Sequence, residues 1–216
     1  MSRLARVQRV RVDRDHPSEA TLAGVADAIR HGAIVVIPTD TLYGLAVNPF
    51  DASSVSRLFA AKGRRADQAV PLIASSRAQV EQVFGPLAGI AARLADRFWP
   101  GPLTLLLQAP DALSAVAAET GRVGVRVPAL EVARALCAAA GMPLTATSAN
   151  LSGQAPTDDA DVAASAWQAS ADILLDVGPT RGGQPSTIVD ATGREPVLVR
   201  PGAIPWDEIV TCLARE

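Results

Sequence analysis

The run Lys62-Gly63-Arg64-Arg65 is the strongest candidate for chemistry in the sequence. The chain has 20 basic residues, and Lys62 is the only lysine among them. Lysine carries a compact ammonium on a flexible stem, whereas arginine carries a rigid planar fork. A lone lysine beside two arginines therefore predicts a site for an anion such as a phosphate group. The alternative is that these cations compensate the dipole at the end of a helix.

Two segments place small polar side chains directly after apolar strands. Pro38-Thr39-Asp40-Thr41 follows the strand expected at residues 33–37, and Ser148-Ala149-Asn150 ends the one that begins at Leu144. Ligands of open α/β sheets bind outside strand ends, where such groups offer neutral hydrogen bonds. The alternative for the first segment is a turn in which Asp and Thr satisfy their own backbone.

Arg126 lies in the middle of an otherwise apolar strand, residues 123–128. A buried arginine without an anionic partner is costly. Arg126 must therefore pair with an internal carboxylate or face a cleft that receives an anionic ligand. We favour the cleft.

The composition limits the classes of protein to consider. The chain has 216 residues, of which 49% are hydrophobic, and a net charge of −2. It can form one full core and is not a generally basic nucleic-acid binder. It has neither an uninterrupted apolar run of about 20 residues nor a secretory signal, so we expect a cytoplasmic protein without a membrane segment. Two scattered cysteines and two histidines argue against a zinc site.

Apolar periodicity predicts alternating helices and strands over the whole chain. We expect one α/β domain over residues 1–216, with its core at about 20–205, in which helices flank a twisted, mostly parallel or mixed sheet. Expected helices cover residues 21–31, 51–62, 76–84, 87–98, 130–140, 157–168 and 206–213. Expected strands cover residues 9–13, 33–37, 45–47, 70–74, 103–107, 123–128, 144–150, 173–176, 186–190 and 197–200.

Seven short motifs occur in one order between about residues 20 and 205. Each is weak alone, but the ordered set resembles the YrdC-like family, the threonylcarbamoyl-AMP synthases. The motifs are Pro38-Thr39-Asp40-Thr41, Lys62-Gly63-Arg64, Trp99-Pro100-Gly101-Pro102-Leu103-Thr104, Val125-Arg126-Val127-Pro128, Ser148-Ala149-Asn150, Pro185-Ser186-Thr187-Ile188-Val189-Asp190 and Val199-Arg200-Pro201-Gly202.

The resemblance implies a large concave cleft and a nucleotidyltransferase reaction. In that reaction L-threonine, bicarbonate and ATP give threonylcarbamoyl-AMP and pyrophosphate. A partner threonylcarbamoyl transferase complex would then modify the adenosine beside the anticodon of certain tRNAs. Binding of tRNA or RNA by the chain itself would be weak.

The resemblance also implies roles for single residues. Lys62 and Arg64 would be catalytic and would hold the phosphates of ATP, with Mg²⁺ bound through those phosphates and no metal site of the protein's own. The other implied ATP-binding residues are Ser148, Asn150 and Arg200. The implied threonine-binding residues are Thr41, Arg126 and Ser186, with Arg126 the partner of the threonine carboxylate.

Three positions depart from the common pattern of the family. Arg65 stands where many members have Pro, Gln68 where Lys or Asn is usual, and Ile73 where some long members have a His near threonine. Because the chain ends near residue 216, we expect the short form, without the extra C-terminal domain of the long form.

Two other functions remain open from the sequence. One is a module that binds RNA or tRNA without chemistry, which the acidic net charge disfavours. The other is a carbamoyl-adenylate-forming domain, as in hydrogenase maturation. Such domains usually belong to much larger chains with zinc-finger-like cysteines.

Overall fold

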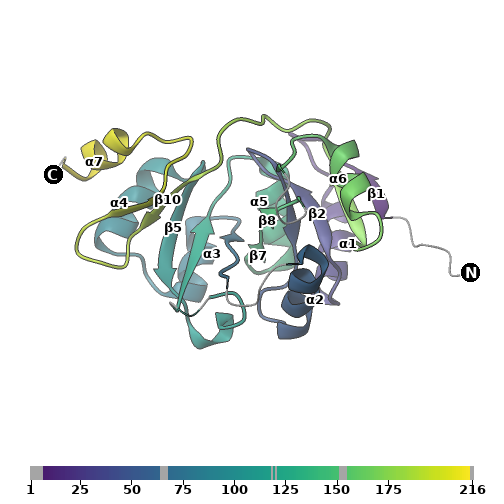
Figure 1. The fold of residues 1–216 in the computed structure, drawn as a ribbon, viewed down its shortest axis with the longest axis horizontal. Coiled ribbons are helices and arrows are strands. Elements are labelled where there is room, and N and C mark those ends of the chain that lie inside the picture. The colour runs from purple at the N-terminus through teal and green to yellow at the C-terminus, as the bar shows by residue number, and fades with distance from the viewer. Residues whose placement is uncertain (1–6, 64–67, 118, 120, 151–154, 215–216) are drawn as a thin grey trace, which may run out of the picture.

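The computed structural model describes residues 7–63, 68–117, 119, 121–150 and 155–214. Its strands form two mixed sheets with helices packed around them (Figure 1). The five-stranded sheet has the order β1 (Gln8–Arg11), β9 (Ile173–Asp176), β2 (Val35–Pro38), β3 (Tyr43–Ala46), β8 (Thr147–Ser148). The six-stranded sheet has the order β11 (Val197–Arg200), β10 (Thr187–Asp190), β5 (Leu103–Gln108), β6 (Arg122–Arg126), β4 (Leu72–Ile73), β7 (Leu144–Thr145).

The expected α/β fold with helix-flanked mixed strands is confirmed, and the structure divides those strands between two sheets. In the five-stranded sheet β2 pairs in parallel with β9 but antiparallel with β3. In the six-stranded sheet β5 pairs in parallel with β10 and antiparallel with β6. The division could not be read from the sequence, because apolar strands with similar patterns can pair in either sheet.

The expected helices are present, with some shifted ends. They are α1 (Glu19–Arg30), α2 (Ala52–Lys62), α3 (Arg77–Phe84), α4 (Gly89–Phe98), α5 (Glu131–Ala140), α6 (Ala160–Trp167) and α7 (Trp206–Ala214). Helix α6 begins later than residue 157, because Asp159 caps it by accepting hydrogen bonds from the N–H groups of Asp161 and Val162. A capping carboxylate there satisfies two backbone donors that the first turn leaves open.

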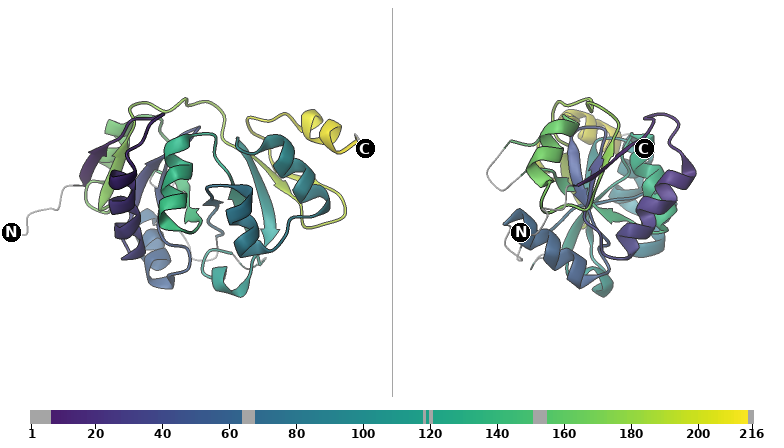
Figure 2. Two further views of the ribbon diagram at one scale, coloured as in Figure 1. Left: turned by 180° about the vertical axis from the view of Figure 1, so that it is seen from behind. Right: turned by 90° about the vertical axis from the view of Figure 1, so that its right-hand side faces the viewer.

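Helices α1 and α5 lie side by side behind both sheets (Figure 2). Their apolar faces form one buried cluster with strands of each sheet. Leu22 of α1 and Leu136 of α5 belong to it, together with Val35 of β2 and Leu144 of β7. This helix layer therefore joins the two sheets on one side.

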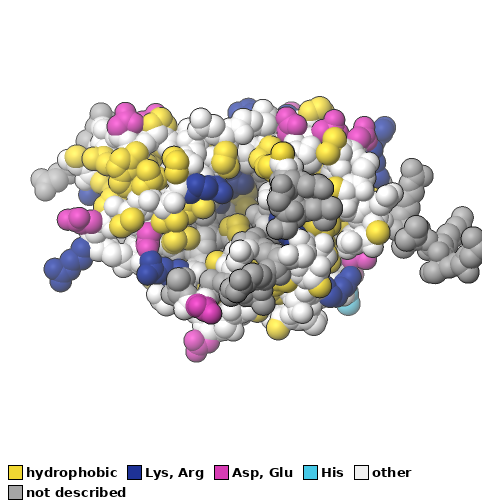
Figure 3. Space-filling view, in the orientation of Figure 1, with side chains coloured by type: hydrophobic (Ala, Val, Ile, Leu, Met, Phe, Trp, Pro, Cys, Tyr) yellow, Lys and Arg dark blue, Asp and Glu magenta, His cyan; other side chains and the backbone are white. Residues whose placement is uncertain are grey.

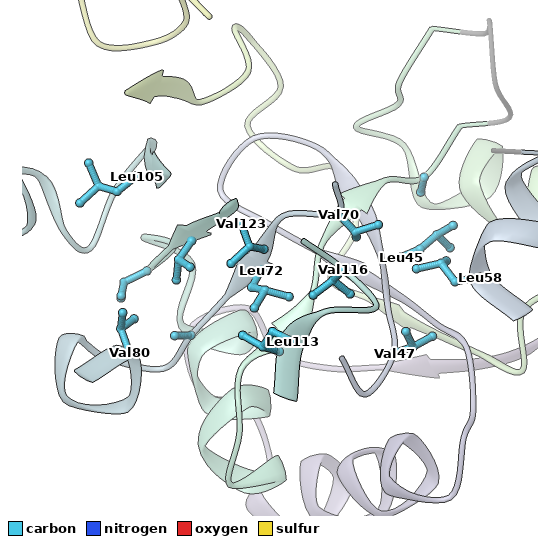
Figure 4. Packing of buried hydrophobic residues seen from close by; sticks show 14 of the residues in the cluster. Leu45, Val47, Leu58, Val70, Leu72, Val80, Leu105, Leu113, Val116 and Val123 are labelled. Carbon is cyan, nitrogen blue, oxygen red and sulfur yellow. The ribbon is translucent and has the colours of Figure 1, made fainter. Parts of the chain in front are cut away.

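A second, larger cluster fills the space between the sheets and the other helices. Figure 4 shows members of it, from Val80 of α3 and Leu105 of β5 at one end to Leu45 of β3 and Leu58 of α2 at the other. Burial of such side chains stabilises the fold by about 1.5–3 kcal/mol each. Both clusters contain residues of both sheets, so the two sheets share their hydrophobic core.

Among the described residues, no helix has the length and apolar character needed to cross a membrane.

Candidate functional site

A cavity of about 340 Å³ lies between the two sheets. The five-stranded sheet contributes Tyr43, Gly44 and Ser148, and the six-stranded sheet contributes Thr104 and Arg126 among others. The surface is hollowed near the middle of the face in Figure 3, where basic side chains are visible. The cavity brings together five residues predicted from the sequence, namely Thr41, Arg126, Ser148, Ser186 and Arg200.

The loop between β2 and β3 presents Thr41 to the cavity, because Thr39 holds the turn. The Thr39 hydroxyl donates to the carbonyl oxygen of Leu42 at 2.7 Å. It also accepts from the backbone N–H groups of Thr41 and Leu42, each at 3.3 Å. The turn interpretation was thus correct for Thr39, whose side chain satisfies the local backbone. Thr41 lines the cavity beside it.

Arg126, at the end of β6, meets both expectations that the sequence left open. Its Nη1 lies 3.1 Å from Oδ1 of Asp40, and each side chain is 9% exposed. Arg126 also lines the cavity. Burial lowers the pKa of Arg126, and the nearby Asp40 charge opposes that shift. The sequence did not pair these two residues, because they lie 86 positions apart, Asp40 in the loop between β2 and β3 and Arg126 on β6 of the other sheet.

The contact between Arg126 and Asp40 is ionic without being a well-directed hydrogen bond. The distance of 3.1 Å allows Coulomb attraction, yet neither Arg126 Nη1 nor Asp40 Oδ1 has a partner of hydrogen-bond geometry. Asp40 uses its other oxygen, Oδ2, to accept from the N–H of Ala129 at 3.2 Å. Since buried polar groups normally have hydrogen-bond partners, this exception indicates a place where a ligand can act.

A second arginine reaches the same cavity from β11. Arg200 Nη2 donates to the carbonyl oxygen of Ser186 at 2.7 Å and to its hydroxyl at 3.1 Å. Burial, and then the positive charge of Arg126, lower the pKa of Arg200. Two guanidinium groups that disfavour each other in one cavity suit an anionic ligand.

Thr104 of β5 is a cavity residue to which the sequence analysis assigned no role. Its hydroxyl lies 2.8 Å from the Ser186 hydroxyl, and its side chain is buried. The signal in the sequence was slight, since one Thr in the apolar run Leu103–Leu107 is compatible with an ordinary strand.

Lys62 ends α2 and points to the strand that carries the Ser148 motif. Asp51 caps the helix by accepting from the N–H of Ser53, and Gly63 ends it with a φ of 60°. Lys62 is buried, and its Nζ donates to Thr147 Oγ1 at 3.0 Å and to the Ser148 carbonyl oxygen at 2.6 Å. Lys62 is therefore not a solvated surface charge: its ammonium lies at the cavity residues Thr147 and Ser148.

The other positions singled out in the sequence have different surroundings. Asn150 follows Ser148 by two residues and has its side-chain oxygen buried. Ile73 lines the cavity and pairs with Arg126 in the β4–β6 register. Gln68 is exposed. Arg64 and Arg65 lie outside the described residues.

The described part of the chain has no group of three or more His, Cys, Asp or Glu residues that could hold a metal ion. Its cavity offers hydroxyl groups, backbone groups and cations instead. Such a donor set suits an anionic ligand.

Comparison with known proteins gives consistent matches over most of the chain. A family profile described as "Telomere recombination" (Sua5_yciO_yrdC) matches residues 27–202. The chain is 39% identical over 199 residues to the threonylcarbamoyl-AMP synthase of Pyrococcus abyssi, covering 91% of this chain and 58% of that protein. It is 37% identical over 194 residues to the enzyme of the same name from Bacillus subtilis, covering 89% and 56%. The chain thus spans less than two thirds of these two relatives.

Other relatives match over most of their own length. A putative threonylcarbamoyl-AMP synthase of Mycobacterium tuberculosis is 37% identical over 193 residues, covering 89% of this chain and 88% of that protein. The crystal structure of P. abyssi Sua5 complexed with L-threonine has a TM-score of 0.88 at 36% identity, covering 96% of this chain and 61% of that one. Escherichia coli YciO has a TM-score of 0.81 at 25% identity, covering 91% and 96%. By its profile match, its relatives and its fold, the chain belongs to the Sua5/YciO/YrdC family.

Proposed function

We propose that the protein is a threonylcarbamoyl-AMP synthase, which forms threonylcarbamoyl-AMP, pyrophosphate and water from L-threonine, bicarbonate and ATP. One observation carries the proposal: a single cavity contains Arg126, Arg200 and the hydroxyl groups of Thr41 and Ser186, with Lys62 at its Ser148 edge. Relatives of 37–39% identity bear this enzyme's name, and a relative of similar fold is known with L-threonine bound.

Threonine would bind at the Arg126 part of the cavity. The Arg126 guanidinium has charge and hydrogen-bond donors that match the substrate carboxylate. Asp40 balances the charge of Arg126, and Arg126 Nη1 makes no directed hydrogen bond within the described residues. Thr41 and Ser186 would supply neutral hydrogen bonds to the same substrate.

The nucleotide would bind toward Lys62, Ser148, Asn150 and Arg200, with Arg64 following Lys62 in the chain. The carbamate of threonine attacks the α-phosphorus of ATP, and pyrophosphate leaves. The protein contributes by positioning the reactants and stabilising negative charge, as in other transfers at phosphorus. A carbamate is already anionic, so a general base is not required. Mg²⁺ would enter with the phosphates of ATP, which commonly bind it in such sites.

We further propose that residues 1–216 form one domain and act in the cytoplasm. The two core clusters shared by both sheets support a single folding unit. The product would pass to a threonylcarbamoyl transferase complex that modifies the adenosine beside the anticodon of certain tRNAs.

The decisive measurement is pyrophosphate release from ATP and bicarbonate, with and without L-threonine. We expect threonine-dependent release by the wild type and loss of at least about 100-fold in Lys62→Ala, as is typical when one preorganised charge contact is removed from an active site. Arg57→Ala is the matched control, since Arg57 is a cation of the same helix that contacts Gly32 and Asp172 instead of the cavity.

The other outcomes have different consequences. Threonine-dependent release that survives in Lys62→Ala would keep the enzyme and remove the role given to Lys62. Use of carbamoyl phosphate without threonine would indicate a carbamoyl-adenylate-forming domain. Salt-dependent RNA binding without ATP consumption would indicate an RNA-binding module.

A further inference from the structure

Three polar side chains form one hydrogen-bonded series on the cavity wall. They come from β5, from the residue before β10 and from the end of β11. Arg200, at the end of β11, donates to the Ser186 hydroxyl at 3.1 Å. Ser186 precedes β10, and its hydroxyl lies 2.8 Å from that of Thr104 on β5. All three line the cavity, and the Thr104 and Ser186 side chains are more than nine-tenths buried. Such a series restricts the orientation of each member.

The direction of the hydrogen bonds follows from the chemistry of the groups. A guanidinium has only donors, so the Ser186 oxygen must accept from Arg200. The hydroxyls of Thr104 and Ser186 have two protons, of which their mutual hydrogen bond uses one. Among the described residues, these two hydroxyls contact no further acceptor. One hydroxyl proton therefore remains for a ligand in the cavity, whichever of the two oxygens donates to the other.

Because Gly124 has no side chain, it leaves space for the Thr104 methyl group, and this sets the orientation of the Thr104 side chain. A Cβ atom at Gly124 would lie 2.9 Å from Thr104 Cγ2. The methyl group of Thr104 thus occupies room that only glycine leaves on β6. Because β-branched side chains have few allowed χ1 rotamers, fixing the methyl group also fixes the hydroxyl. In this rotamer the hydroxyl lies beside Ser186.

We infer that Thr104 is a positioning residue: its hydroxyl donates to the Ser186 oxygen, so that the Ser186 hydroxyl donates its own proton to an anionic oxygen of the amino-acid substrate. The inference rests on the proposed function, because it takes that substrate to be L-threonine. An acceptor-only carboxylate or carbamate oxygen suits this arrangement, whereas a group that itself donates would face the guanidinium of Arg200 and an opposing hydroxyl proton. Thr104 and Gly124 thereby become determinants of specificity.

The first test is the dissociation constant of L-threonine, measured by calorimetry on the purified protein. Thr104→Val keeps the shape of the side chain and removes its hydroxyl, and we expect about tenfold weaker binding, the size of one lost hydrogen bond. Thr104→Ser keeps the hydroxyl and should stay within about threefold of the wild type. Thr145→Val is the control, because Thr145 is a buried threonine whose hydroxyl bonds the backbone of Leu45 and Val47 and does not line the cavity.

A double-mutant cycle separates positioning from a merely structural role. If Thr104 acts through Ser186, Thr104→Val will have less than about a twofold effect in a Ser186→Ala background. An equal effect in both backgrounds would overturn the inference. Gly124→Ala gives an independent route if Thr104→Val does not fold. That variant keeps both hydroxyls but displaces the Thr104 methyl group, and we expect severalfold weaker binding.

The result for the wild type distinguishes failure of the proposed function from failure of this inference. Wild-type protein that does not bind L-threonine would overturn the proposed function and this inference together. Wild-type protein that binds L-threonine, with Thr104→Val and Gly124→Ala unchanged, would overturn this inference alone. In kinetic assays the same variants should raise the KM for L-threonine and leave kcat nearly unchanged.

Discussion

At the scale of single residues, Arg126 and Asp40 form a buried ion pair. Arg126 nevertheless also presents a charged hydrogen-bond donor to the cavity. Desolvation makes such a pair weak evidence for stability, but removing one partner leaves an uncompensated buried charge. The pair is therefore best explained by what Arg126 does in the cavity.

The stability of variants tests this account of the ion pair. Arg126→Met should lower the free energy of unfolding by about 3 kcal/mol, because Asp40 then stays buried without its partner. Adding Asp40→Asn should recover part of that loss, since the second change removes the stranded charge. Urea unfolding of the three proteins gives both values. A double variant that is less stable than Arg126→Met alone would contradict the prediction.

Two buried acidic groups predict how stability changes at alkaline pH. Burial raises the pKa of the Cys137 thiol from 9.0 to about 12, and that of the Tyr43 hydroxyl from 10.0 to about 12. Both groups are neutral below their ordinary pKa, so their effect on stability is constant there. Above it the unfolded chain releases these protons first, and folding is disfavoured until the folded-state pKa is reached.

We therefore expect the free energy of unfolding to fall as the pH rises above about 9, with the slope for Cys137 growing to about 1.4 kcal/mol per pH unit near pH 10. Cys137→Ala should flatten the fall between about pH 9 and 10, where Tyr43 does not yet contribute. Urea unfolding at several pH values measures the slope. Identical slopes for the wild type and Cys137→Ala would rule out this assignment.

At the scale of elements, the turn after β11 holds Arg200 against Ser186. The turn approaches the backbone at residues 185–187 so closely that a Cβ at Gly202 would lie 2.3 Å from the Pro185 carbonyl oxygen and 2.5 Å from the Thr187 nitrogen. Real Cβ atoms do not approach backbone atoms this closely, so the turn requires glycine. Packing thus requires the glycine of the Val-Arg-Pro-Gly motif, and this packing positions the cavity residue Arg200.

Gly202→Ala should separate β11 from the start of β10 and move Arg200 away from Ser186. We expect a destabilisation of about 1–3 kcal/mol from the forced overlap, with weaker binding of L-threonine or ATP. Gly193→Ala is the matched control in the same hairpin, because a Cβ there would come no nearer than 3.5 Å to the Glu195 carbonyl oxygen. Equal stability of the two variants would show that the turn can relax without cost.

At the scale of the whole molecule, the cavity lies between two sheets that share both core clusters. Any ligand that fills the cavity contacts both sheets at once. Ligand binding should therefore stabilise the fold as a whole, because a ligand that binds only the folded state shifts the folding equilibrium.

L-Threonine at about 100 times its dissociation constant should stabilise the wild type by about 2.7 kcal/mol. For a chain of this size that corresponds to a rise in Tm of about 5–10 °C. Arg126→Met should show little or no rise, because the proposed carboxylate partner is missing. Differential scanning fluorimetry of both proteins, with L-serine and L-valine for comparison, tests this prediction. An equal rise in both proteins would place threonine elsewhere.

The sequence by itself determined most of the local structure and the residues that gather at the cavity. Apolar periodicity located the helices and strands, because each must bury one face. Strand ends with small polar side chains located Thr41 and Ser148, and an isolated charge in an apolar strand located Arg126. A lone lysine at a helix end located Lys62.

Only the tertiary structure decided which of these residues meet. The pairing of strands into two sheets, the ion pair of Arg126 with Asp40, and the contact of Lys62 with Thr147 all join segments far apart in the chain. The series Arg200–Ser186–Thr104 also depends on Gly124, whose missing side chain matters only once β5 and β6 are adjacent. Such contacts depend on strand register and on unfilled volume, which are properties of the packed molecule that no local pattern encodes.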